Sequence, residues 1–225
     1  GLFTSCKEPK PTVYLKHFSY SNADSIPQVS VHRGGKNLLG YPENCLETMV
    51  YINDSINAIF EVDVAQTKDG KLVLMHDNSI NRTTTGDGLL RRMTYDELSR
   101  YNLKDDFGTV TKFKVPLFSD VLKWSKAHQV VLTVDVKRSV SQQRVIKAIK
   151  SAKAENTCIL ITYDLDQAES AYKLAPELLL SVSARNTAEF DRLLKSRIPV
   201  ENMVAFTGTR LSKPEHFRAI HNQDI

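Results

Sequence analysis

The chain has 225 residues, of which 41% are hydrophobic and 25% are charged, as in an ordinary globular domain. The net charge of +4 is mild and the sequence has no block of lysines and arginines, so its composition does not indicate nucleic-acid binding. No apolar run approaches the roughly 20 residues of a membrane-spanning helix. The three cysteines are too far apart for a CxxC metal site or a disulfide framework.

Residues 1–28 are predicted to form a leader. Small residues precede Cys6, and a polar, proline-rich stretch follows it, as at the end of a bacterial lipoprotein signal peptide. On this interpretation Cys6 carries a lipid, which would be the only attachment to a membrane. The protein would then lie in the bacterial cell envelope, periplasmic or membrane-anchored. The alternative is a disordered terminus in which Cys6 is incidental.

From residue 29 onward, β-branched apolar runs alternate with amphipathic helical patterns, which predicts parallel βα units. The interval 78–116 interrupts this alternation with polar loops and one short helix, for which Thr94 and Glu97 form a capping box. The seven predicted strands are 29–33, 58–64, 72–75, 130–135, 157–163, 178–182 and 202–206. Helices are expected at 42–55, 117–128, 141–154, 165–175, 187–196 and from about 213. We expect one domain over 29–225, with one strand fewer than the eight of a closed (β/α)8 barrel.

Two histidines stand at the ends of predicted strands. His32 and Arg33 end the first strand before a pair of glycines, and His76 ends the third. Histidine titrates closest to neutral pH, so a pair of histidines can act as acid and base. The guanidinium of Arg33 can bind a phosphate oxygen pair. Either histidine alone would more often be structural, but two at strand ends, each followed by a charged residue, favour catalysis.

Three carboxylates also lie at or near strand ends. Glu61 and Asp63 are two residues apart, so their side chains leave the same face of a strand. Asp135 ends the next strand after the interruption, and Lys137 leaves that strand on the same side. Carboxylate oxygens select a hard cation, Mg²⁺ or Ca²⁺, and the lysine could hold a phosphate oxygen. The simpler alternatives are a solvated strand face for the first pair and a rim ion pair between Asp135 and Lys137.

Acid, base, divalent cation and anion-binding side chains are the parts that cleavage of a phosphodiester needs. The order of the motifs closely resembles the glycerophosphodiester phosphodiesterase family, a group of phospholipase C-like TIM barrels, over residues 29–137. The motifs are His32-Arg33-Gly34, Pro42-Glu43-Asn44, Glu61-Val62-Asp63, Asp69-Gly70, His76-Asp77, Asn81-Arg82-Thr83-Thr84, Gly86-x-Gly88, Val115-Pro116-Leu117 and Asp135-Val136-Lys137. Beyond residue 137 the resemblance is only of architecture.

The resemblance implies an α/β fold, a (β/α)8 TIM barrel with a small insertion after the third strand, where 78–116 falls. It implies one divalent cation, Mg²⁺ or Ca²⁺, held by Glu61, Asp63 and Asp135. The activity it implies is hydrolysis of small glycerophosphodiesters to glycerol phosphate and an alcohol.

The resemblance also implies a mechanism. His32 and His76 would be the acid–base pair, with Arg33 and Lys137 near the phosphate. A free hydroxyl of the glycerol would attack phosphorus, a cyclic phosphate would form as the alcohol leaves, and water would open the ring.

The sequence departs from the family pattern in three places. Asp135 stands where glutamate is usual, and Cys45 where threonine or serine is usual. The later Trp-Thr-Val-Asn strand and Gly-x-Asp segment of the family are not found, and the single tryptophan is Trp124. We therefore expect the intact protein to be longer and the chain as given to lack the last strand or strands. Two alternative functions stay open: cleavage of inositol or sphingolipid headgroups, and an inactive barrel that acts as a binding protein.

Overall fold

A computed structural model describes residues 18–27 and 29–225 of the chain. Cys6, the predicted lipid attachment site, lies outside the described residues. The described chain divides into two compact units. The first, here called the 27–161 unit, is Pro27–Ile161. The second, here called the 162–225 unit, joins Thr162–Ile225 to the described residues 18–26.

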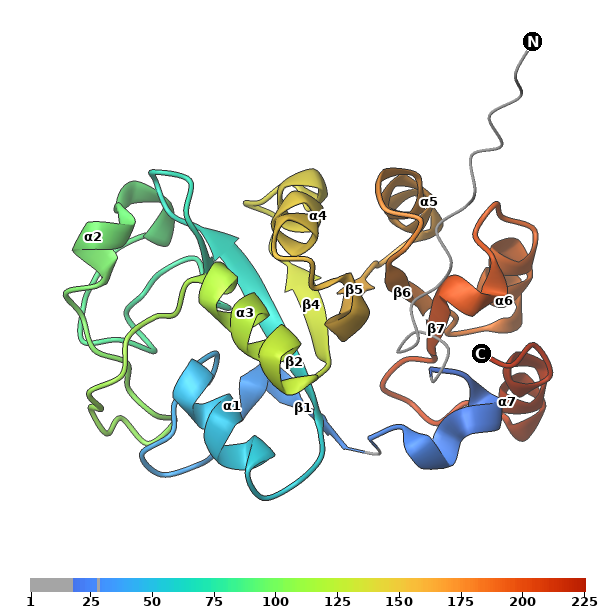
Figure 1. Ribbon diagram of the computed structural model, residues 1–225, viewed down its shortest axis with the longest axis horizontal. Helices are drawn as coiled ribbons and strands as arrows, with labels where there is room; N and C mark the ends of the chain where they lie inside the picture. The colour runs from blue at the N-terminus through green and yellow to red at the C-terminus, as the bar shows by residue number, and fades with distance from the viewer. Residues whose placement is uncertain (1–17, 28) are drawn as a thin grey trace, which may run out of the picture. The chain divides into compact units, whose positions relative to one another are not determined.

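The 27–161 unit contains a parallel sheet of four strands, β1 (Ser30–Val31), β2 (Ile59–Gln66), β4 (Leu132–Val136) and β5 (Cys158–Ile161). Helices α1 (Leu46–Asn53), α3 (Phe118–His128) and α4 (Gln142–Ser151) follow strands along the chain (Figure 1). The centre of this unit is apolar because Phe60, Val62 and Val64 of β2 are fully buried. The rings of Phe60 and Trp124 meet edge to face at 6.1 Å, which packs α3 on β2.

Strand β3 (Leu72–Leu74) departs from the predicted parallel arrangement. It pairs antiparallel with β2, and Val64 lies opposite Leu74. The chain between the two strands is a short turn, in which Gly70 has a φ of 79° and donates its N–H to the Thr67 carbonyl. A parallel connection needs a dozen or more residues, so such a short one can only form a hairpin. The prediction of seven strands in parallel βα units is therefore wrong at β3, and β4 takes the parallel place beside β2.

The predicted insertion is a small folded lobe with its own apolar cluster. Its helix α2 (Tyr95–Leu98) begins with the predicted capping box, in which Thr94 Oγ1 accepts from the N–H of Glu97 and the carboxylate of Glu97 accepts from the N–H of Thr94. Buried side chains of the insertion pack against Cys45 before α1, Ala65 of β2, and Val73 and Met75 in and just after β3. The members from the insertion are Ile80, Leu90, Leu98, Leu103 and Val115. The insertion is thereby fastened to β3 and to the end of β2.

The 162–225 unit holds the parallel pair β6 (Leu179–Ser183) and β7 (Met203–Phe206). Its helices are α5 (Leu165–Leu174), α6 (Thr187–Leu194) and α7 (Pro214–His221). A short turn at Tyr20–Ser25, within the predicted leader, contacts the end of α7, where the N–H of Ser21 donates to Asp224 Oδ1 at 2.6 Å. Among the described residues, no helix is long and apolar enough to cross a membrane.

Candidate functional site

The first predicted motif forms a tight turn instead of a strand end. Strand β1 stops at Val31, and His32–Gly34 form one turn of 3-10 helix in which Arg33 has a φ of 51°. Gly35 has a φ of 132°, and a Cβ there would lie 2.6 Å from Thr48 Cγ2. Only glycine fits this position, because other side chains would clash with α1 and strain the backbone. The turn therefore packs its glycines on α1 and leaves the side chains of His32 and Arg33 just after the end of β1.

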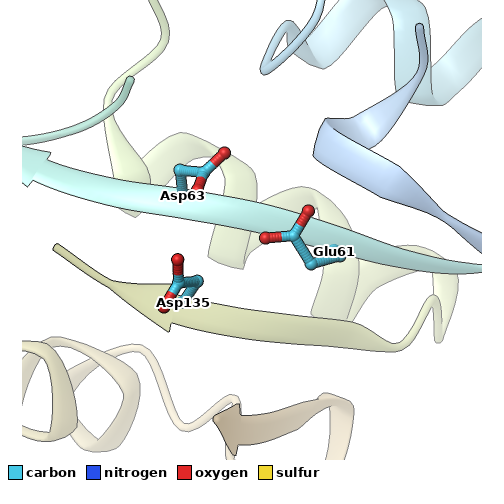
Figure 2. Close-up of side chains that lie close together, drawn as sticks. All are labelled: Glu61, Asp63 and Asp135. Atoms are coloured by element: carbon cyan, nitrogen blue, oxygen red, sulfur yellow. The ribbon is translucent and has the colours of Figure 1, made fainter. Parts of the chain in front are cut away.

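Register brings the three predicted carboxylates together. Asp63 of β2 lies directly opposite Asp135 of β4, and Glu61 lies two residues earlier on the same face of β2. One oxygen from each of the three side chains lies within 4.8 Å of the others (Figure 2). The carboxylates meet only because β2 and β4 are neighbours in the parallel sheet. The antiparallel strand β3 does not separate them, since it pairs with β2 outside that sheet.

The negative charges of Asp63 and Asp135 repel that of Glu61 and make its ionisation less favourable. Burial raises the pKa of Glu61 to about 7, and the negative charge of Asp63 adds to the effect, although the N–H of Arg33 donates to Glu61 Oε2 at 2.7 Å. Asp63 is held from the other side by Asn44, whose Nδ2 donates to Oδ2 at 2.8 Å. The backbone N–H of Asp63 donates in turn to Asn44 Oδ1. These bonds fix the orientation of the Asp63 carboxylate.

Lys137 lies between the two aspartates. Its Nζ is 2.6 Å from Asp63 Oδ1 and 2.8 Å from Asp135 Oδ2. Burial alone would lower the pKa of Lys137, but the hydrogen bonds to Asp135 and Asp63 raise it. One ammonium against three carboxylates leaves an excess of negative charge. An all-oxygen donor set with this excess fits a hard divalent cation such as Mg²⁺ or Ca²⁺.

The two histidines have different surroundings. His76 Nε2 accepts from a guanidinium nitrogen of Arg33 at 2.9 Å, and its Nδ1 lies 2.8 Å from Asp77 Oδ1. Because a guanidinium can only donate, a neutral His76 ring carries its proton on Nδ1, toward Asp77. His32 is 68% exposed at its side chain, and its Nε2 is 3.9 Å from Glu61 Oε2. His76 is thus held in a fixed orientation, whereas His32 faces solvent beside the carboxylates.

A buried ion-pair network that sequence reasoning missed supports these groups. Glu43, 2% exposed, accepts from Arg82 at 2.8 and 3.0 Å, from Lys36 at 2.7 Å and from Arg33 at 3.3 Å. Burial would raise the pKa of Glu43, but the hydrogen bonds from Arg82 and Lys36 outweigh it and lower the pKa to about 2. Arg82 also binds Asp77, the partner of His76, and the hydrogen bond from Arg82 lowers the pKa of Asp77 well below its usual value.

The missed residues carried a sequence signal. Glu43 lies in the Pro42-Glu43-Asn44 motif, and Arg82 in the Asn81-Arg82-Thr83-Thr84 motif, 39 residues away. Both motifs were part of the family resemblance, but no role followed from their spacing. The predicted helix from Pro42 begins only at Leu46, because Asn44 takes a φ of 50° to reach Asp63.

All the predicted site residues lie in the 27–161 unit, where hydrogen bonds, ion pairs and the close approach of the three carboxylates connect them. Their roles as catalysts, cation ligands and phosphate-binding groups stay predictions. The seven residues are His32, Arg33, Glu61, Asp63, His76, Asp135 and Lys137.

Comparison with known proteins assigns the chain to a family. The model of the glycerophosphoryl diester phosphodiesterase family matches residues 32–222. An uncharacterized protein, YqiK, of Bacillus subtilis is 32% identical over 162 residues, which cover 68% of this chain and 65% of that protein. A glycerophosphodiester phosphodiesterase of Bacillus altitudinis is 27% identical over 186 residues, which cover 78% of this chain and 74% of the relative.

A solved structure shares the fold. A glycerophosphoryl diester phosphodiesterase from Parabacteroides distasonis superposes with a TM-score of 0.87 at 28% identity, covering 94% of this chain and 74% of that chain. The likeness confirms the predicted fold class, an α/β fold of the TIM-barrel type. The chain spans somewhat less than two thirds of YqiK, the uncharacterized relative from Bacillus subtilis. The chain belongs to the glycerophosphoryl diester phosphodiesterase family.

Proposed function

We propose that this protein hydrolyses glycerophosphodiesters to glycerol phosphate and an alcohol. The observation that carries the proposal is the cluster of Glu61, Asp63 and Asp135 within 4.8 Å, linked to His76 through the backbone and side chain of Arg33. Family membership, the activity named for the relative from Bacillus altitudinis and the +4 net charge support the same reaction.

Glu61, Asp63 and Asp135 would hold one divalent cation, Mg²⁺ or Ca²⁺. When bound, the cation supplies a Lewis acid that offsets negative charge on phosphate oxygen and lowers the pKa of a nearby hydroxyl. Arg33 would bind a phosphate oxygen, and Lys137 would do the same on the side of the two aspartates. Asn44 would keep the Asp63 carboxylate in one orientation while the cation and the substrate bind.

His32 and His76 would move the protons. In the first step, one histidine takes the proton of the glycerol hydroxyl that attacks phosphorus, and the other donates a proton to the departing alcohol. The product is a cyclic phosphate. In the second step one histidine would take a proton from a water molecule whose oxygen bonds to phosphorus, and the other would donate a proton to the ring oxygen whose bond to phosphorus breaks, which gives glycerol phosphate. Asp77 would stabilise the protonated ring of His76, because it lies 2.8 Å from Nδ1.

The test is release of glycerol phosphate from glycerophosphocholine and glycerophosphoethanolamine, with Mg²⁺ or Ca²⁺ present and again after chelation. We expect chelator-sensitive release, and its loss in His76→Ala and His32→Ala variants that keep the wild-type circular dichroism spectrum. Glu215→Gln, an exposed substitution on α7, is the control and should keep activity. A folded wild-type protein that releases no product with either metal would contradict the proposal and favour the other lipid headgroups or an inactive barrel.

A location in the cell envelope is a further proposal, which rests on the sequence around Cys6. Mass spectrometry of the native N-terminus tests it. A diacylglyceryl group on Cys6 would support it, and an unmodified, longer N-terminus would contradict it.

A further inference from the structure

A cavity of about 320 Å³ lies beside the candidate site within the 27–161 unit. The end of β2, the turn after β4 and the insertion around Leu90 line it, and His76, Asp77 and Lys137 form its border with the candidate site. Its volume falls in the range of roughly 300–1,000 Å³ that small-molecule pockets occupy. Two further arginines line it, Arg91 and Arg138.

The cavity has an excess of positive charge. In the described part of the chain, neither Arg91 nor Arg138 forms a side-chain hydrogen bond or ion pair. The one carboxylate of the lining, Asp77, is already bound to His76 and Arg82. Lys137 is likewise bound to Asp63 and Asp135. Two guanidinium groups without anionic partners therefore remain to attract an anion.

Ordered backbone carries both arginines. Arg91 sits in the 3-10 turn Leu90–Arg92, which buried Leu90 anchors and in which the N–H of Leu90 donates to the Asn78 carbonyl at 2.9 Å. Arg138 lies in the turn after β4, closed by the N–H of Val140, which donates to the Lys137 carbonyl at 2.9 Å. The insertion and the turn after β4 thus each place one arginine at the cavity.

The position of the cavity decides which part of a substrate could enter it. If the proposed reaction is correct, the attacking glycerol lies beside the cation ligands Glu61, Asp63 and Asp135, none of which lines the cavity. The cavity instead borders His76 and Lys137, which the proposed reaction places beside the phosphate. The group that enters it is therefore the other substituent of phosphorus, the departing alcohol.

We propose that this cavity is a subsite for glycerophosphodiesters whose alcohol carries an anionic group, either a carboxylate or a second phosphate, and that Arg91 and Arg138 determine this specificity. The proposal rests on the proposed hydrolysis and adds the class of alcohol to it. It also assigns a role to the insertion, because Arg91 is one of its residues.

Two matched pairs of substrates test the subsite with the full chain. Glycerophosphoserine differs from glycerophosphoethanolamine only by a carboxylate, and glycerophosphoglycerol bearing a terminal phosphate differs from glycerophosphoglycerol only by that phosphate. We expect kcat/KM to be about tenfold higher for the anionic member of at least one pair, as for one added hydrogen bond to a charged group. The pair with the larger ratio identifies the carboxylate or the phosphate as the recognised group.

Variants show whether the cavity causes the preference. In Arg91→Gln/Arg138→Gln, the ratio should fall to about one, whereas Arg92→Gln, the adjacent arginine outside the cavity lining, should keep the wild-type ratio. Thermal unfolding checks that all variants are folded. Turnover of all substrates without an anionic preference, or a preference that survives in the double variant, would overturn the subsite and leave the proposed hydrolysis standing. No turnover of any substrate by the folded wild-type protein would overturn both.

Discussion

At Asp135 the chain carries a carboxylate one methylene shorter than the glutamate that the family resemblance implies. The structure shows why the shorter side chain still reaches the cluster. The parallel register places Asp135 directly opposite Asp63, and one oxygen of each of the three acids lies within 4.8 Å of the others. A role as a cation ligand therefore does not require glutamate here.

Asp135→Asn should weaken cation binding, because the site loses one of three negative charges. In the wild-type protein, Mg²⁺ or Ca²⁺ at about 100 times its Kd should stabilise the fold by about 2.7 kcal/mol. The variant should show at least a tenfold higher Kd. Fluorescence of Trp124, the single tryptophan, reports unfolding of the unit that contains the site.

Asp96→Asn is the matched control, because Asp96 is an exposed carboxylate on α2 that forms an ion pair with Arg100. Its cation-induced shift in unfolding temperature should equal that of the wild-type protein. An equal shift in Asp135→Asn would remove Asp135 from the ligand set.

Helix α1 begins without a side-chain capping hydrogen bond. Cys45 occupies its N-cap with extended φ and ψ angles and makes no side-chain cap hydrogen bond; its S–H donates instead to Glu47 Oε2. Burial raises the pKa of this thiol to about 12, so it stays protonated and unreactive at neutral pH.

Cys45→Ser should be more stable than Cys45→Ala by about 1 kcal/mol, because a serine oxygen at the N-cap accepts a backbone N–H of the first turn. Both substitutions remove the buried sulfur, so their difference isolates the cap. Urea denaturation followed by circular dichroism measures the two free energies of unfolding. Equal values would show that the N-cap of α1 needs no side-chain acceptor.

The turn after β1 depends on glycine for reasons of space as well as backbone. Gly35→Ala should destabilise the protein by about 1–3 kcal/mol more than Gly40→Ala, the overpacking cost of a crowded site. Both glycines have positive φ, 132° and 79°, but a Cβ at Gly35 meets Thr48 and Ile52 within 3 Å, whereas a Cβ at Gly40 meets nothing within 4 Å. Thermal unfolding of the two variants compares them, and a smaller loss in Gly35→Ala would contradict the packing argument.

At the scale of the whole molecule, the Glu43 network links the acid stability of the fold to the site. The folded-state pKa of Glu43 is lowered from 4.5 to about 2, so its ion pairs contribute stability that is fully present above pH 4.5. This contribution is lost as pH falls from about 4.5 towards 2. The carboxylate binds Arg82, Lys36 and Arg33 at once, so the loss loosens the support of His76 and Arg33 together.

Glu43→Gln should lower the free energy of unfolding at pH 7 by about 2 kcal/mol, because the partly exposed Arg33, Lys36 and Arg82 lose their hydrogen bonds to one shared carboxylate. It should also flatten the fall in stability between pH 5 and pH 3 relative to wild type. Urea denaturation over this pH range measures both effects. Glu155→Gln, at a surface turn, is the control and should keep the wild-type slope. A parallel pH dependence in wild type and Glu43→Gln would contradict the lowered pKa.

Much of the fold and the site followed from sequence patterns. Apolar runs located the helices and strands within a few residues, as at α3 and α5, because the period of apolar residues is a local property. Charged residues and histidines at or near the ends of apolar runs identified the seven candidate site residues. In the structure, hydrogen bonds, ion pairs and short distances connect these seven residues. The orientation of β3 was wrong because apolar spacing records that a strand is buried and not which neighbour it pairs with.

The sequence by itself determined which face of β2 Glu61 and Asp63 share, because alternation along a strand needs no partner. Only the tertiary structure decided that β4 lies next to β2, which brings Asp135 to Asp63 across an interval that contains the entire insertion. It alone paired Glu43 with Arg82 and placed Arg91 and Arg138 around one cavity. These contacts join residues far apart in the chain, and such contacts depend on packing and register, which local spacing does not encode.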